Sequence, residues 1–121
     1  MSYLKRGLAR CIELNKKEFS NIVYEIVMDI PFGSVATYGM IAFLSGHPQR
    51  SRMVGQALHH APDSLNIPSH RVVNCLGRLT PGWTEQKQLL ANEGIQLKES
   101  GCVDLKKHLW NFAQLIPFDR L

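Results

Sequence analysis

Two adjacent residues near the middle of the chain, Ser69 and His70, carry the side chains of a nucleophile and a general base. Pro68 stands directly before them. Its ring fixes its own φ and restricts Ile67 to extended backbone, which predicts a rigid, non-helical position for Ser69. A side chain held in this way suits the floor of a pocket. From these residues alone, an enzyme that uses Ser69 with His70 stays open.

The cysteines are not arranged as a metal site or a disulfide framework. Cys11, Cys75 and Cys102 are widely spaced, and no Cys-x-x-Cys pair occurs. An odd count without paired spacing argues against a disulfide scaffold and a structural zinc site. We therefore expect free thiols, no metal, no cofactor and a cytoplasmic protein, associated with the nucleoid if the source is bacterial.

Length and charge indicate one ordinary globular domain. The chain has 121 residues, of which 45% are hydrophobic and 20% charged. The formal net charge of +4 permits a polyanionic partner without requiring one. No apolar run approaches the length of a membrane span, so we expect no membrane partner.

The clearest helix follows Asn15, which forms a capping box with Glu18. Pro31 ends the helical pattern. Apolar residues recur there at intervals of three and four, which predicts one buried face. These residues are Phe19, Ile22, Val23, Ile26, Val27 and Ile30.

Two short helices follow with the layout of a helix-turn-helix. Thr37 caps the first, over residues 38–45, and Gly46 ends it. The second covers residues 51–61. Its predicted buried side is Met53, Val54, Ala57, Leu58 and Ala61, and its predicted outer face is Arg52, Gln56, His59 and His60.

The remaining segments complete a winged helix-turn-helix. Residues 71–74, 75–77 and 78–80 are typical of strand, turn and strand, so we expect a β-hairpin in which Cys75 is structural. We further expect a helix over 84–92 with Leu89 and Leu90 inward, and a last helix over 104–112 that buries Leu105, Leu109 and Phe112. The predicted fold class is mostly α with a small β-hairpin. The predicted organisation is an N-terminal extension with helical spacing (1–17), a DNA-binding domain (18–112) and a C-terminal tail (113–121).

Several motifs in this order resemble the DNA-binding domain of O6-alkylguanine-DNA alkyltransferases, from about Phe19 to Leu97. The matching pieces are Ile30-Pro31-Phe32-Gly33-Ser34-Val35 with Thr37-Tyr38, then Arg52-Met53-Val54-Gly55-Gln56-Ala57, then Ile67-Pro68-Ser69-His70-Arg71-Val72, then Leu89-Leu90-Ala91-Asn92-Glu93-Gly94.

One residue departs from the alkyltransferase pattern. The family carries Pro-Cys-His-Arg, and the cysteine accepts the alkyl group; this chain has Ser69 at that position. A serine hydroxyl is a far poorer nucleophile than a thiolate at an alkyl carbon. The chain therefore resembles the alkyltransferase-like proteins more closely. These keep the fold and the pocket but do not remove the lesion, and many of them carry tryptophan at this position.

The resemblance also implies roles for residues that would touch DNA. Arg52 matches a finger that fills the gap left by an extruded nucleotide, and Tyr38 matches a tyrosine that crowds the 3′ phosphate. Gly55, Gln56 and Ala57 belong to the helix that would enter the minor groove. The residues alone leave alternatives open: a surface arginine, a core aromatic, and tight helix packing at Gly55.

The resemblance assigns two further groups of residues. The lesion pocket would be formed by Ser69, Tyr38, Val72 and Trp83, although Val72 also fits a strand core and Trp83 a packed aromatic. His70, Arg71 and Glu93 would form a structural polar network, because no thiol is present to be activated.

The resulting expectation is a non-enzymatic protein, a monomer, that binds O6-alkylguanine in duplex DNA and marks the lesion for nucleotide excision repair proteins. Two alternatives remain: an alkyltransferase or hydrolase that uses Ser69 and His70, and a winged-helix transcription factor without lesion preference.

Overall fold

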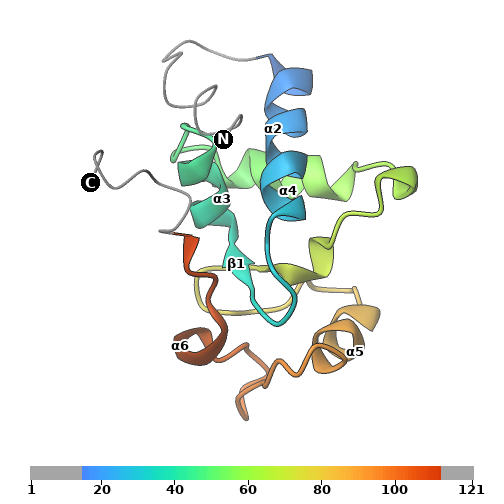
Figure 1. Cartoon of the computed structure of the whole chain (residues 1–121), viewed down its shortest axis with the longest axis vertical. Coiled ribbons are helices and arrows are strands. Elements are labelled where there is room, and N and C mark those ends of the chain that lie inside the picture. Colours follow the sequence, from blue (N-terminus) through green and yellow to red (C-terminus); the bar gives the residue numbers. More distant parts are fainter. Residues whose placement is uncertain (1–14, 113–121) are drawn as a thin grey trace.

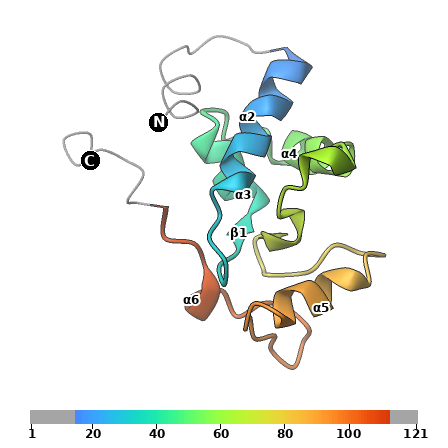
Figure 2. The same cartoon turned by 45° about the vertical axis from the view of Figure 1, so that its right-hand side comes forward.

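A computed structural model describes residues 15–112 (Figure 1). The predicted helical spacing before Asn15, Cys11, and the tail after Phe112 lie outside these residues. Figures 1 and 2 show three helices, α2 (Lys16–Met28), α3 (Tyr38–Leu44) and α4 (Ser51–His59), gathered at one end of the molecule. Helices α5 (Glu85–Ala91) and α6 (Leu105–His108) lie at the other end.

Helix α2 (Lys16–Met28) confirms the predicted capping box. The Asn15 Oδ1 atom accepts a hydrogen bond from the Glu18 backbone N–H at 2.8 Å, and the Asn15 amide donates to Glu18 Oε1 at 2.6 Å. All six predicted apolar residues of this segment are buried. The helix therefore begins and faces the core as its sequence dictates.

Helices α3 (Tyr38–Leu44) and α4 (Ser51–His59) form the predicted helix-turn-helix. Thr37 Oγ1 accepts from the Met40 N–H at 3.1 Å, and Gly46 takes a φ of +88° just after α3. In α4, only Val54 and Ala57 are buried; Met53 and Leu58 are half-buried. The end of α4 is two residues earlier than predicted.

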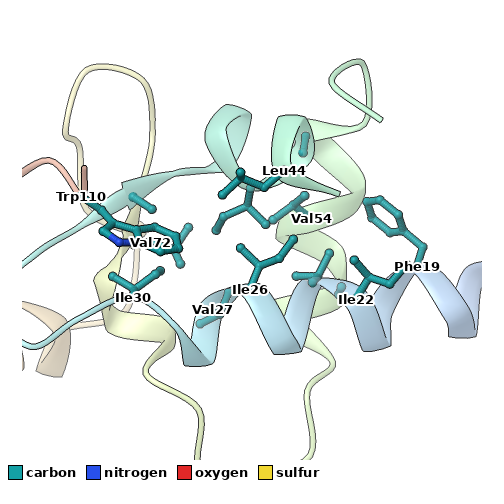
Figure 3. Packing of buried hydrophobic residues seen from close by; sticks show 14 residues of the cluster. Phe19, Ile22, Ile26, Val27, Ile30, Leu44, Val54, Val72 and Trp110 are labelled. Atoms are coloured by element: carbon teal, nitrogen blue, oxygen red, sulfur yellow. The ribbon is translucent and has the colours of Figure 1, made fainter. Parts of the chain in front are cut away.

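The main core lies between these three helices. Ile22 and Ile26 of α2 point towards Val54 of α4 and Leu44 of α3 (Figure 3). The Tyr24 hydroxyl donates to the Ala57 carbonyl at 2.9 Å and adds a polar link between α2 and α4. The position of α4 is thus fixed by its buried face, and the outer face is left for solvent or a partner.

The predicted β-hairpin is wrong. Strand β2 (Val72–Val73) pairs in parallel with β1 (Ala36–Thr37), so its partner lies far back in the sequence. Residues 74–78 form a turn, in which Asn74 Oδ1 accepts from the Leu76 and Arg78 N–H groups and the Asn74 N–H donates to the Arg78 carbonyl at 3.2 Å. Within this turn, the Gly77 carbonyl accepts from the Val103 N–H at 2.8 Å. Cys75 is exposed in this turn and supports no core.

The last helices are shorter than predicted. Helix α5 (Glu85–Ala91) buries Leu90, but Leu89 is 36% exposed. Helix α6 (Leu105–His108) stops before Leu109, which is exposed and forms a bridge with Val35. The Trp110 N–H donates to the Val35 carbonyl at 2.7 Å, and the indole is buried in the main core. Pairing with Val35 thus replaces a further turn of helix.

Within residues 15–112, none of the helices combines the length and the apolar character needed to cross a bilayer. The same residues contain no cluster of three or more His, Cys, Asp or Glu side chains suited to a metal ion.

Candidate nucleic-acid interface

A cavity of about 790 Å³ opens between the C-terminal half of α4 and the loop of residues 80–83. The residues that line this cavity include Pro68, Ser69 and His70 from the central motif and Tyr38 and Gly55 from α3 and α4. The other lining residues are Leu58, His59, Ala61, Pro62, Asp63, Asn66, Ile67, Thr80, Pro81, Gly82, Trp83 and Leu89. The predicted pocket residues Ser69, Tyr38 and Trp83 are therefore brought together around one space.

Ser69 begins a single-turn 3-10 helix, η2 (Ser69–Arg71). The expectation of non-helical backbone is wrong here, because the Arg71 N–H donates to the Pro68 carbonyl at 3.0 Å and closes the turn. The chain passes directly from η2 into strand β2. Ser69 is half-buried and borders the cavity.

Tyr38 and Gly55 face each other across the junction of α3 and α4. A Cβ atom at Gly55 would lie 3.8 Å from Tyr38 Cε1, an ordinary van der Waals distance. Packing inside the protein therefore does not require glycine at this position. Tyr38 also packs partly against the core, and its hydroxyl lies 3.4 Å from Thr80 Oγ1.

The remaining predicted DNA-binding residues separate into two groups. Arg52 and Gln56 are exposed on α4, one helical turn apart on the same face. Ala57 is only 6% exposed and belongs to the core, so its side chain presents no surface to a partner. Val72, predicted as pocket wall or strand core, is 1% exposed, lies in β2 and does not line the cavity.

The predicted polar network of His70, Arg71 and Glu93 is present beneath the cavity. His70 Nε2 lies 2.6 Å from Glu93 Oε2, and Arg71 Nε donates to both Glu93 oxygens at 2.9 Å. The Gly33 N–H donates to Glu93 Oε1 at 2.8 Å, and Arg71 Nη1 donates to the Ile30 carbonyl at 2.7 Å. The network therefore ties η2 to the turn after α2 and to the segment after α5.

The Glu93 carboxylate is held in its charged form. Burial alone would raise its pKa, but the hydrogen bonds from Arg71, Gly33 and His70 and the Arg71 charge outweigh it, and the net effect is a lowered pKa. Arg71 thus braces the loops around Glu93.

Many residues of the site were not assigned from the sequence, and three of them are instructive. His59 was placed on the outer face of α4 without a role, and it lines the cavity. Leu89 was predicted to point inward, but it borders the cavity instead. Gln86 is fully buried and bonds to both the floor and the wall of the site. Its position four residues before Leu90, on the same face of α5, is the signal that could have shown its burial.

Comparison with known families gives one decisive match. The sequence model of the 6-O-methylguanine DNA methyltransferase DNA-binding domain matches residues 18–95. The chain belongs to this family. The match confirms the resemblance drawn from the four motifs. It includes α3, α4 and α5, each of which contributes residues to the lining of the cavity.

Other members of the family include proteins that are similar over most of this chain. A DNA base-flipping protein of Escherichia coli is 40% identical over 97 residues, which cover 78% of this chain and 75% of that protein. Alkyltransferase-like protein 1 of Schizosaccharomyces pombe is 37% identical over 97 residues, which cover 76% of this chain and 90% of that protein.

The solved structure of that S. pombe protein, in complex with damaged DNA containing O6-carboxymethylguanine, has a TM-score of 0.73 and 34% identity. The match covers 81% of this chain and 99% of the other. The mostly helical fold with a small parallel strand pair is therefore the fold of the alkyltransferase-like members of the family.

Proposed function

We propose that this protein recognises O6-alkylguanine in duplex DNA, rotates the damaged nucleotide into the cavity beside Ser69, and holds it there without transferring the alkyl group. The observation that carries the proposal is the cavity itself. Its volume of about 790 Å³ lies within the range of pockets that enclose a small-molecule-sized group. It opens directly beside α4, the helix that would contact DNA if the resemblance to the family holds at this position.

The cavity has the chemical character that an alkylated base requires. Leu58, Ile67, Pro81 and Leu89 supply apolar wall, and Trp83 supplies an aromatic ring. Enzymes and binding proteins that extrude a base hold it by stacking on such side chains and by hydrogen bonds to its edge. Polar residues, among them Ser69, His70 and Thr80, also line the cavity and could bond to the edge of the base.

Helix α4 supplies the face that would meet the duplex. Arg52 is exposed one turn before Gln56, and Gly55 leaves the surface open beside Tyr38. Because Gly55 has room for a methyl group on the protein side, close approach of the DNA backbone is the better reason for glycine. In this arrangement Arg52 fills the gap in the base stack, and Tyr38 crowds the 3′ phosphate of the target nucleotide.

Ser69 gives the site no acceptor for the alkyl group. A serine hydroxyl is a far poorer nucleophile at an alkyl carbon than a thiolate, even beside a histidine. The His70 Nε2 atom lies 2.6 Å from Glu93. Cys75 and Cys102, the cysteines of residues 15–112, do not line the cavity. The arrangement therefore favours binding over transfer.

The relatives support the same function. The E. coli relative is named for base flipping, and the S. pombe relative was solved with damaged DNA that contains O6-carboxymethylguanine. By extension, we propose that this protein acts as a monomer and marks the lesion for nucleotide excision repair proteins.

The decisive experiment is a titration of the full chain with matched duplexes that contain guanine or O6-methylguanine, followed by mass spectrometry of the protein. We expect tighter binding to the modified duplex and an unchanged protein mass. An added methyl group, or recovery of repaired guanine, would establish an enzyme that uses Ser69 and His70. Equal affinity for the two duplexes would establish a DNA-binding protein without lesion preference.

A further inference from the structure

We propose that Gln86 is a positioning residue that joins the floor of the cavity to its wall, and so determines how well the site distinguishes a damaged base. This inference rests on the proposed function. Gln86 lies in α5 and is 0% exposed, which is unusual for a glutamine side chain. It does not line the cavity, so it would act through the residues that do.

The Gln86 amide makes three hydrogen bonds to the main chain of two separate segments. Its Nε2 group donates to the His70 carbonyl at 3.1 Å and to the Val72 carbonyl at 3.2 Å. Its Oε1 atom accepts from the Thr80 N–H at 2.7 Å. Both hydrogens of the amide nitrogen and one lone pair of its oxygen are therefore used.

The first two bonds fix the floor. His70 directly follows Ser69 in η2, and Val72 is the first residue of β2. Strand β2 is paired with β1, which leads straight into Tyr38 at the start of α3. Gln86 holds the carbonyl groups of the residues on both sides of Arg71. It thereby fixes the position of Ser69 relative to Tyr38.

The third bond fixes the wall. Thr80 starts the loop that carries Pro81, Gly82 and Trp83 over the cavity. The Trp83 N–H donates to the Thr80 carbonyl at 3.2 Å, and the Gln86 N–H donates to the Trp83 carbonyl at 3.3 Å. The loop is thus a chain of turns attached at both ends to Gln86, once through its side chain and once through its backbone.

Only an amide satisfies all three partners. Two carbonyl groups need donors and one N–H needs an acceptor, a combination that neither an apolar side chain nor a carboxylate can provide. Leu90, one turn later in α5, already fills the core beneath the helix. An apolar residue at position 86 could pack in α5 but would leave these three main-chain groups without their amide partner. The amide therefore links α5 to the floor and to the wall of the site.

The first test is Gln86→Met, which keeps the length of the side chain and removes its hydrogen bonds. The chain has two tryptophans, and Trp110 is buried. Quenching of fluorescence by acrylamide therefore reports mainly on Trp83. Without DNA, we expect Gln86→Met to increase the quenching of Trp83. With DNA, we expect the preference for O6-methylguanine over guanine duplex to fall about tenfold, with affinity for unmodified duplex unchanged.

Gln88→Met is the matched control. Gln88 lies in the same helix but is exposed, and its amide donates to the Asn92 side chain at 2.9 Å. We expect neither the quenching nor the duplex preference to change in this variant. If Gln86→Met lowers only the urea midpoint and leaves both readouts unchanged, Gln86 is a packing residue and the proposal is wrong.

A second variant covers the case in which Gln86→Met does not fold. In Gln86→Glu, the ionised carboxylate faces two carbonyl oxygens, whereas the protonated acid can donate to one of them and still accept from Thr80. We expect Trp83 shielding and lesion preference to recover as the pH falls from about 8 to about 5, relative to the unmodified protein at each pH. No recovery would contradict the proposal. If the unmodified protein shows no lesion preference but Trp83 responds as described, the proposed function fails while the link made by Gln86 stands.

Discussion

His70 Nε2 lies 2.6 Å from the Glu93 carboxylate, but that carboxylate also accepts from Arg71 and from the Gly33 backbone. The contacts from Arg71 and Gly33 give this carboxylate structural partners besides His70. They join the turn after α2, the floor of the cavity and the end of α5. In a chain with Ser69 in place of a thiol, we therefore interpret the pair as the support of the pocket floor.

Replacement of Glu93 should destabilise the whole domain. The Glu93 side chain is 5% exposed, and Glu93→Gln would leave the Arg71 guanidinium facing a neutral amide in a mostly buried setting. We expect a loss of about 2–3 kcal/mol in the free energy of unfolding, measured by urea denaturation. Glu99→Gln, at an exposed position, should change it by less than about 0.5 kcal/mol. Equal stability of the two variants would show that the network contributes nothing.

The same carboxylate predicts a dependence of stability on acid. Because the pKa of Glu93 is lowered in the folded protein from 4.5, the unfolded chain takes up the proton first as the pH falls. The contribution of Glu93 is therefore complete above 4.5 and is lost as the pH falls towards the lowered value. Urea midpoints measured at a series of pH values should fall more steeply below that point for the unmodified protein than for Glu93→Gln. Parallel curves would contradict this assignment.

Gly55→Ala should separate stability from DNA binding. A methyl group at Gly55 would meet Tyr38 Cε1 at 3.8 Å, so the folded protein has room for it. Alanine in a helix interior is favoured over glycine by about 0.5–1 kcal/mol, so we expect thermal stability to rise. Affinity for duplex DNA should fall, because the methyl group stands where the DNA backbone approaches. A stabilised variant with unchanged affinity would show that α4 does not come close to DNA at this point.

The parts of the fold that were predicted correctly depend on local sequence. The Asn15 capping box, the Thr37 cap and the apolar face of α2 are set by residues within a few positions of one another, and all are present. The four motifs likewise identified the family because they are contiguous strings.

The errors came from partners that are distant in the sequence. Val72 pairs with Ala36 and not with a strand beyond Asn74, and the Gly77 carbonyl accepts from the Val103 N–H. Neither contact can be predicted from the local sequence pattern. In α5, Gln86 points inward and Leu89 does not. The inward position of Gln86 depends on its hydrogen bonds to the carbonyl groups of His70 in η2 and Val72 in β2, which lie near α5 only in the folded chain. Ser69, Tyr38 and Trp83 were predicted from the family resemblance and line the cavity, whereas Val72 does not line it and the three main-chain partners of Gln86 were not predicted.

Arg52→Ala should weaken lesion binding far more than Lys98→Ala. Both side chains are exposed, so neither change should move the urea midpoint by more than about 0.5 kcal/mol. We expect Arg52→Ala to reduce affinity for O6-methylguanine duplex by about tenfold or more, since nothing else fills the gap in the base stack. Lys98→Ala removes one positive charge at a distance from α4 and should have little effect. Equal losses would mean that Arg52 contributes only charge. Fluorescence anisotropy at one fixed salt concentration makes the comparison.

His47 lies in the turn between α3 and α4, and it makes the stability of the helix-turn-helix sensitive to mild acid. Its ring is buried edge-on against Phe19, and burial, together with the nearby Arg50 charge, lowers its pKa from 6.5. The unfolded chain therefore binds the proton first as the pH falls below 6.5, and stability declines until the pH is below the lowered value. His47→Phe keeps an aromatic edge against Phe19 and cannot take up a proton. The difference in urea midpoint between His47→Phe and the unmodified protein should thus widen as the pH is lowered through this interval. His60→Gln, which removes an exposed imidazole, serves as the control and should follow the unmodified protein. A constant difference across the interval would show that His47 does not couple protonation to folding.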